Sequence, residues 1–548
     1  MVRSFVKRGL SVIASKQTNI FSAAFFIILT TFISQVLGWL KYRLLASQFG
    51  ASSEVGVFIA SFRIPDFIFQ VLIAGALTSA FIPVFSKFVE HHNEKEGYKF
   101  ASTVASLGLV AYCVIAIPVI IFPYFFSSMI VPGYSHAEIS LMANLTRVIM
   151  LAQIFFILGT IATGILQTFH RFLVAGVASA LYNVGIILGI IFLAPSFGIY
   201  GVTIGALFGA FLFFFVQIPF VYRMGFKFIP RIRFDEDLKK LLKLMLPRSL
   251  TLLLTQISIS ASVYFTSFIS ARSLVIFDYA QTLMLAPVIL FGQSIAQASF
   301  PALVVKRHDE KEFLSILVAS FNQILYLTLP LSVLLIVLRI PIVRLFYGAD
   351  RFDWQATLET GMTLAFFAVS ISAQALIYLL SRAFYAFKDA QTPFLITLIS
   401  VIVNVFLSFI FIMVLHLPVF YLALSFSVAN VVSIVLLIIF INLRVKLPLF
   451  EIGLSVSKIL VATLTMGFAL YIPIKLLDQL VFDTTRTINL FILTGISSLA
   501  GLCSFLFFTW LLDIKEVYYI FAVIKKFSSR HKILKQLSEL IDLPTHNP

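Results

Sequence analysis

The stretch FRIPDFIFQVLIAGALTSAFIPVF, residues 62–85, decides the class of this protein. Arg63, Pro65 and Asp66 stand at its start, and no charged residue follows from Phe67 to Phe85. A helix needs about 20 apolar residues to cross the hydrocarbon core of a bilayer, so this run is long enough to span a membrane. The charged start is then an anchor at a helix end, a kink or part of a substrate site.

Composition extends this reading to the whole chain. Of 548 residues, 60% are apolar, 12% are charged and 61 are phenylalanine. A soluble protein needs a larger polar surface than this chain supplies. The net charge of +16 is spread between apolar runs, which is typical of positive-inside topology, and we expect no nucleic acid partner. Cys113 and Cys503 lie within apolar runs and indicate neither a disulfide nor a metal site.

The apolar runs predict an all-α integral membrane protein with about 14 transmembrane helices. The expected spans are 20–46, 57–86, 101–126, 139–167, 172–194, 199–221, 244–270, 274–304, 314–338, 360–385, 393–415, 419–443, 455–476 and 487–512. With the N-terminus in the cytoplasm, alternation places 30 of the 40 lysines and arginines on the cytoplasmic side. This bias predicts that both termini are cytoplasmic and that the first helix is retained.

An internal repeat organises these spans. Matching residues recur 218 apart (Pro83 and Pro301, Phe169 and Phe387) and then 221 apart (Asn183 and Asn404, Tyr200 and Tyr421, Arg223 and Arg444). Six spans are an even number, so we expect two parallel six-helix repeats with a substrate path between them. Chance similarity between phenylalanine- and leucine-rich helices is the alternative.

The repeat and the charges divide the chain into five segments. These are an N-terminal six-helix lobe (1–222), a basic cytoplasmic linker (223–243), a C-terminal six-helix lobe (244–444), two further helices (445–514) and a basic amphipathic tail (515–548). We expect the tail to lie on the anionic cytoplasmic leaflet, although a solvated tail is the alternative.

Polar side chains on the first two helices of each repeat form the candidate substrate site, and the charged ones lie towards the outer side. They are Lys41, Arg43, Arg63, Asp66, Gln70, Arg272, Gln293 and Gln297. Charges within a membrane are costly, and a cluster of cations beside a cavity suits an anionic head group. The alternatives are cations that snorkel outwards as anchors and glutamines that bond between helices.

The sequence contains no HExxH, no GxSxG with partners and no P-loop, so we expect a transporter rather than an enzyme. A membrane glycan ligase or transferase is the alternative from another class.

Three segments resemble the MurJ (MviN) family of lipid II flippases, of the multidrug/oligosaccharidyl-lipid/polysaccharide exporter superfamily. They are SQVLGWLKYRLLASQFGAS (34–52), FRIPDFIFQVLIAGALTSAFIPVF (62–85) and RAFYAFKDAQTPF (382–394). The resemblance implies alternating access between two lobes, which moves the undecaprenyl-pyrophosphate-linked peptidoglycan precursor outwards across the bacterial cytoplasmic membrane. It also implies a lipid-tail groove at helices 13 and 14, and cell-wall synthesis proteins as partners. The alternative is an exporter of another lipid-linked polysaccharide unit or of a drug.

The resemblance carries over only part of the family's cationic site. Lys41 and Arg63 keep family cations, and Asp66 replaces the usual asparagine. An arginine pair of the family is replaced by Phe69 and Gln70.

Two further family positions also depart: the glutamate of AEGA is Ala74, and an arginine of helix 8 aligns with Thr282. We expect no organic cofactor. Sodium, a proton or the membrane potential is expected to drive transport, and Asn404 is the one sodium-site candidate.

Overall fold

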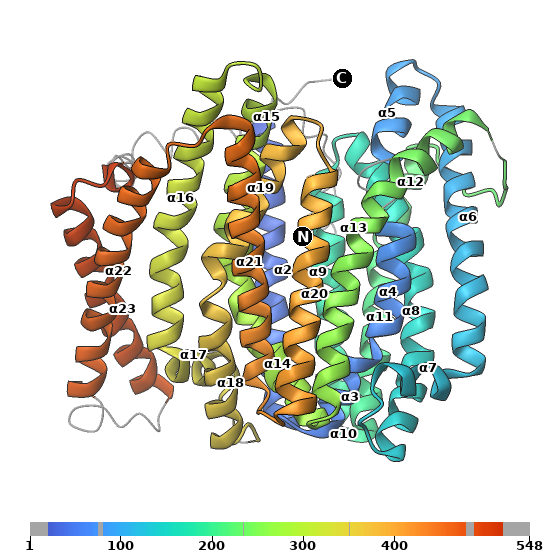
Figure 1. Ribbon diagram of the computed structural model, residues 1–548. Coiled ribbons are helices and arrows are strands. Elements are labelled where there is room, and N and C mark those ends of the chain that lie inside the picture. Colours follow the sequence, from blue (N-terminus) through green and yellow to red (C-terminus); the bar gives the residue numbers. More distant parts are fainter. Residues whose placement is uncertain (1–19, 75–80, 234, 350, 478–486, 519–548) are drawn as a thin grey trace, which may run out of the picture. The chain divides into compact units, whose positions relative to one another are not determined.

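The computed structural model describes residues 20–74, 81–233, 235–349, 351–477 and 487–518, and all regular secondary structure within these ranges is helical (Figure 1). The N-terminal residues 1–19 and the predicted amphipathic tail beyond residue 518 lie outside the described residues. The chain forms two compact units. Unit 1 comprises 1–276, 346–356 and 405–419, and unit 2 comprises 277–345, 357–404 and 420–548.

Unit 1 is built mainly from the helices before residue 276. They are α2 (Ile20–Phe49), α3 (Ser53–Ser61), α4 (Arg63–Phe69), η1 (Gln70–Ala74), α5 (Ile82–Glu90), α6 (Glu94–Ile121), α7 (Pro123–Ile130), α8 (His136–Thr168), α9 (Phe172–Leu188), η3 (Gly189–Leu193), α10 (Ala194–Phe197), α11 (Ile199–Phe215), α12 (Ile218–Arg223) and α13 (Glu236–Ser267). The label η marks a π-helical segment. Because α13 belongs to unit 1, the units do not coincide with the predicted lobes, and the division into lobes stays a prediction.

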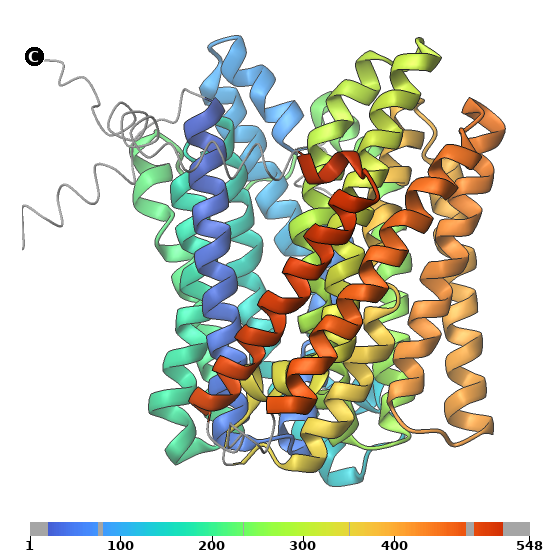
Figure 2. The same ribbon diagram turned by 90° about the vertical axis from the view of Figure 1, so that its left-hand side faces the viewer.

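Most of the remaining helices belong to unit 2. They are α14 (Ala271–Pro287), which crosses the unit boundary, η4 (Val288–Gln293), α15 (Ser294–Val305), α16 (Glu310–Val337), α17 (Arg339–Tyr347), α18 (Trp354–Ala368), α19 (Ile371–Ala386), α20 (Gln391–Phe409), η5 (Ile410–Val414), α21 (Phe420–Val445), α22 (Leu449–Leu477) and α23 (Thr487–Leu511). The last two pack side by side (Figures 1 and 2).

Each expected span contains helix, and the all-α membrane class is confirmed. Within the described residues, 11 helices are long and apolar enough to cross a membrane, or 12 if the bent pair α18–α19 is one span. Two expected spans are outside this count: α2, and α13, whose apolar part is the shorter Leu252–Ser267. The count of 14 therefore stays a prediction.

The π-helical segments follow the register of the sequence repeat. η1 begins at Gln70 and η4 at Val288, which is 218 residues later. η3 begins at Gly189 and η5 at Ile410, which is 221 residues later. π-Helical turns are rare and occur mostly as single-turn interruptions of α-helices. Their recurrence at both offsets supports the two-repeat interpretation.

Glycines bring α9 and α11 together within unit 1. A Cβ atom at Gly185 would lie 2.2 Å from the Cα atom of Gly209, and one at Gly189 would lie 2.6 Å from the Cα atom of Gly205. Gly185 and Gly189 are four residues apart on one span, and Gly205 and Gly209 are four residues apart on the other. This is the small-residue pattern that permits close packing of membrane helices. A larger residue at either position would push the two helices apart.

Candidate substrate site

Pro65 interrupts the second predicted span at its charged start. α3 ends at Ser61 and α4 begins at Arg63, since proline has no N–H to donate to the carbonyl four residues back. The hydroxyl of Thr146 on α8 donates to that Ser61 carbonyl instead, at 3.4 Å. Neighbouring side chains commonly satisfy the carbonyl that a proline frees in a membrane helix. The proline is therefore a break in the span that α8 stabilises.

The apolar face of α4 fixes the direction of its polar face. Ile64 and Ile68, one turn apart, are buried in a cluster with Tyr112 and Met150. The Tyr112 hydroxyl donates to the Met150 carbonyl at 2.7 Å, so no polar atom of that tyrosine is left unpaired. Arg63, Asp66 and Gln70 are spaced i, i+3 and i+7 and share another side of the span.

Asp66 has a partner from α8 that the sequence did not indicate. The Nε2 atom of Gln153 donates to Oδ1 of Asp66 at 3.2 Å, and Gln153 is only 3% exposed. Within the described residues, Nε of Arg63 and Oε1 of Gln153 are buried with no hydrogen-bond partner. Both unbonded atoms thus lie inside the protein, beside the Asp66 carboxylate that Gln153 already bonds.

Gln70 lies at the start of η1, where the helix widens. The Val71 carbonyl in this segment accepts a hydrogen bond from the Ser249 hydroxyl of α13, at 3.0 Å. This contact links the second and seventh predicted spans within unit 1. Gln70 is half-buried and directly precedes Val71, the residue that Ser249 contacts.

Lys41 and Arg43 lie near the C-terminal end of α2, and both are half-buried. The Lys41 ammonium lies 4.5 Å from the centre of the Tyr42 ring, within the range of a cation–π interaction. Positions two apart on a helix point in different directions, so these two cations cannot share one face.

Arg272 has a partner within the protein. Both terminal nitrogens of its guanidinium lie 3.1 Å from the Asp353 carboxylate oxygens, a bidentate arrangement. Partial burial alone would raise the pKa of Asp353, but hydrogen bonds from the Ala356 N–H and from Arg272 outweigh it and lower that pKa. This pair links the corner between α13 and α14 to the start of α18.

Gln293 and Gln297 lie in unit 2, so the structure describes them separately from the residues above. Gln293 ends η4 and is half-buried, whereas Gln297 is exposed on α15. The Arg382 guanidinium of α19 donates to the Gln293 carbonyl at 3.0 Å. A π-helical segment leaves carbonyls without their usual partner, and here an arginine supplies one.

Asn404, the sodium-site candidate, is 3% exposed on α20. Within the part of the chain that the structure describes, no group of three or more histidine, cysteine, aspartate or glutamate residues could hold a metal ion. A sodium site of amide, hydroxyl and carbonyl oxygens would not need such a group. The sodium site therefore stays a prediction.

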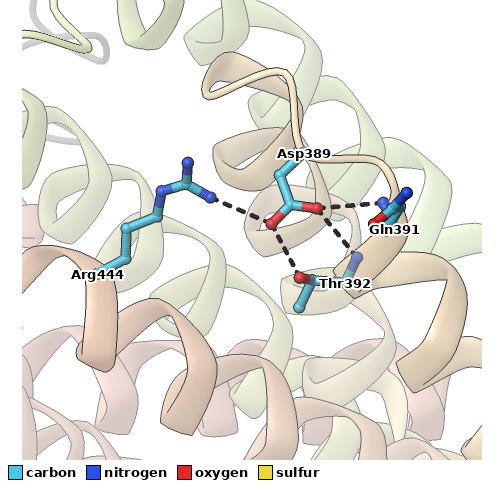
Figure 3. A network of polar contacts seen from close by, with 4 residues as sticks. All are labelled: Asp389, Gln391, Thr392 and Arg444. Atoms are coloured by element: carbon cyan, nitrogen blue, oxygen red, sulfur yellow. Dashed lines mark hydrogen bonds and ion pairs between the residues drawn. The ribbon is translucent and has the colours of Figure 1, made fainter.

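The RAFYAFKDAQTPF segment forms a network of polar contacts at the start of α20 (Figure 3). The Asp389 carboxylate accepts hydrogen bonds from the Gln391 and Thr392 N–H groups, from the Thr392 hydroxyl and from Arg444 on α21. Partial burial alone would raise the pKa of Asp389, but the Thr392 bonds and the Arg444 charge lower it below its usual value. The motif caps a helix and ties it to its neighbour.

An apolar groove of about 340 Å³ lies in unit 2 between α16, α19, α21 and the start of α22. Leu449, Ile452 and Val456 are the α22 side chains that line it. The expected lipid-tail groove at helices 13 and 14 would involve α22 and α23, and it stays a prediction.

Sequence reasoning missed Gln153 and Arg382 as site residues. Gln153 is a lone amide in the apolar run MLAQIFF, and Arg382 is a cation near the end of a span. The cost of placing polar groups in a membrane could have singled out both residues. The groups to which Gln153 and Arg382 hydrogen-bond, by contrast, depend on how the helices pack.

These features define a class. Charged and amide side chains half-buried inside the spans of a polytopic membrane protein are typical of substrate and ion pathways, and they favour a transporter. The fold of this chain is similar to that of a solved multidrug-resistance transporter of the MATE family in the MOP superfamily. That structure has a TM-score of 0.62 and 15% identity, and the match covers 77% of this chain and 98% of the other.

The chain matches one protein family and its members more closely than it matches this fold neighbour. The family described as "Lipid II flippase MurJ" matches residues 45–491. A structure of "Lipid II flippase MurJ, inward closed conformation" has a TM-score of 0.75 and 26% identity, over 89% of this chain and 99% of that one. The chain belongs to the MurJ family.

Two curated relatives give the extent of the match. A "Probable lipid II flippase MurJ" of Thermotoga maritima is 28% identical over 440 residues, which are 80% of this chain and 88% of the relative. A "Lipid II flippase MurJ" of Burkholderia cenocepacia is 26% identical over 412 residues, 72% of this chain and 78% of the relative.

Proposed function

We propose that this protein is a flippase that moves lipid II, the undecaprenyl-pyrophosphate-linked peptidoglycan precursor, from the inner to the outer leaflet. The family match over residues 45–491 carries this proposal, and the likeness to a solved lipid II flippase over 89% of the chain supports it. The protein is a transporter and not an enzyme. Its cargo crosses the membrane chemically unchanged.

The head group of the substrate is proposed to bind beside α4. Arg63 supplies a guanidinium whose Nε is buried without a partner among the described residues, and such donors suit pyrophosphate oxygens. Lys41 and Arg43 would add positive charge from α2. Arg272 would contribute less, because Asp353 already neutralises it.

We place the protein in the bacterial cytoplasmic membrane with both termini in the cytoplasm, on the basis of the lysine and arginine bias. Alternating access between two lobes is the proposed mechanism. Transport would draw on sodium, a proton or the membrane potential. Cell-wall synthesis proteins that make or consume lipid II are the expected partners.

The test is complementation of a bacterial strain depleted of its own lipid II flippase. The wild-type chain should restore growth and make lipid II accessible at the outer surface. Lys240→Gln is a matched control, because Lys240 is an exposed cation that pairs with Asp237 on the same helix. A chain that reaches the membrane in normal amounts but restores no outward movement of lipid II would overturn the proposal.

A second candidate is the flipping of another lipid-linked glycan. The observation in its favour is that Phe69 and Gln70 occupy positions where the family resemblance implies two arginines. Phe69 packs against the Phe156 ring of α8, with ring centroids 6.1 Å apart, so this position is apolar. Proteoliposomes with lipid II and with an undecaprenyl-linked capsule unit would separate the candidates by their relative flipping rates.

A further inference from the structure

A pocket of about 440 Å³ lies in unit 1, away from the charged residues of α4. It is formed by α6, α8, the end of α11, α12 and the chain that follows α12. Its lining is apolar apart from the Lys227 ammonium and the Tyr222 hydroxyl, and includes Leu158, Ala162, Phe214, Ile218 and Phe226. Nothing in the proposed transport of lipid II uses this pocket.

The pocket runs inwards from the basic end of unit 1. Leu158 and Ala162 precede the end of α8 at Thr168 by ten and six residues, which is roughly 9–15 Å along a helix. Lys227 lies beyond α12, in the predicted cytoplasmic linker. The cavity therefore reaches from the level of the linker to the depth of lipid acyl chains.

An ordered strap closes one side of the pocket. The strap, residues 226–231, lies along α6, where the N–H groups of Ile229 and Arg231 donate to the hydroxyls of Ser102 and Ser106 at 3.4 and 3.1 Å. One helical turn on α6 matches two residues of extended chain, about 6–7 Å, so the two bonds form in register. The strap is thereby held in place, and Lys227 with it.

Lys227 lies at the mouth of this pocket, and the sequence around it is basic. Lys227 is exposed, and its ammonium lies 6.0 Å from the centre of the Tyr222 ring. In the sequence Arg223 precedes Lys227 by four residues, and Arg231 and Arg233 follow it. An ammonium group at the mouth of an apolar cavity, on a basic segment, complements a molecule with an anionic head and a hydrocarbon tail, and the cytoplasmic leaflet supplies such molecules.

We propose that this pocket binds an anionic phospholipid of the cytoplasmic leaflet, with one acyl chain in the cavity and its phosphate at Lys227. Tyr222 and Phe228 at the margin are 61% and 41% exposed, as expected for side chains that meet lipid. Away from Lys227 and Tyr222, the side chains that line the cavity are apolar and offer no partner for a peptide backbone, whereas an acyl chain needs none. The lipid would hold the strap and the basic linker against the membrane.

The test uses the full chain in vesicles that contain phosphatidylglycerol with a photoreactive diazirine at the end of one acyl chain. Crosslinked peptides should map to α6, α8 and α12. Native mass spectrometry with added phosphatidylglycerol or phosphatidylcholine should show at least fivefold tighter binding of the anionic lipid. Lys227→Gln should bring the two affinities within twofold, whereas Lys240→Gln should leave the preference intact.

Filling the cavity gives an independent readout. Ala162→Phe should remove the crosslink, and Ile218→Trp fills the cavity from α12 if the first variant does not fold. Equal binding of both lipids by the wild-type chain would overturn the proposal. Crosslinks that map elsewhere, or that survive in a folded cavity-filling variant, would also overturn it.

Discussion

At the scale of single residues, Arg63 and Lys41 carry the strongest prediction about transport. Replacing either with alanine removes a cation from a half-buried position, and a pyrophosphate head group would lose a charge-assisted contact. We expect each variant to restore growth of a flippase-depleted strain at least tenfold less efficiently than wild type, at equal membrane abundance. Arg272→Ala should have a smaller effect, because Asp353 neutralises Arg272. If Arg63→Ala and Lys41→Ala both complement fully, the proposed head-group site is wrong.

Asp389 gives a prediction about pH. Its pKa is lowered in the folded protein, so its ionised form stabilises the fold. That contribution is complete above the ordinary carboxyl pKa of about 4 and is lost as the pH falls through the lower folded-state value. We expect Asp389→Asn to lower the unfolding free energy by about 1 kcal/mol at pH 7, because the amide can still accept the backbone bonds but loses the ion pair with Arg444.

The difference between Asp389→Asn and wild type should shrink towards pH 3. Thermal unfolding of both purified proteins between pH 7 and pH 3 would measure it. A gap that is as large at pH 3 as at pH 7 would contradict the role given to the ionised carboxylate.

At the scale of elements, the break between α3 and α4 rests on one contact between helices. Thr146→Val should leave the Ser61 carbonyl unsatisfied in apolar surroundings, which costs about 1–3 kcal/mol. In a Pro65→Ala background, residue 65 regains an N–H that can donate to that carbonyl, so the same Thr146→Val change should cost much less. A double-mutant cycle by thermal unfolding measures this coupling, and additive effects would show that Thr146 does not compensate for the proline.

At the scale of the whole molecule, the charge bias predicts which loops face the cytoplasm. Pro132 and His91 are both exposed and lie in loops at opposite ends of predicted spans. In a Cys113→Ser, Cys503→Ser background, Pro132→Cys should react with an impermeant maleimide in intact cells. His91→Cys should react only after permeabilisation, and the reverse pattern would invert the proposed topology.

The sequence predicted the helices better than their partners. Each range that hydropathy selected contains helix, because the membrane requires about 20 apolar residues in a row, and Pro65 marked the break in the second span. The number of spans stays a prediction, since 11 or 12 of the described helices are long and apolar enough to cross a membrane. It could not predict that Thr146 would satisfy Ser61, or that Gln153 would bond Asp66, because both contacts depend on which faces of α4 and α8 meet. Likewise, Asp389 stood inside a recognisable motif, but only packing brings Arg444 to it.

The matching positions of the π-helical segments also bear on the ancestry of the chain. A π-helical turn behaves as a one-residue insertion in an α-helix, and two such insertions occur at equivalent places in both repeats. Inheritance explains this better than four separate events. The gene that was duplicated therefore already encoded both interruptions, and two helices in each repeat have kept an irregular turn while most side chains around them diverged.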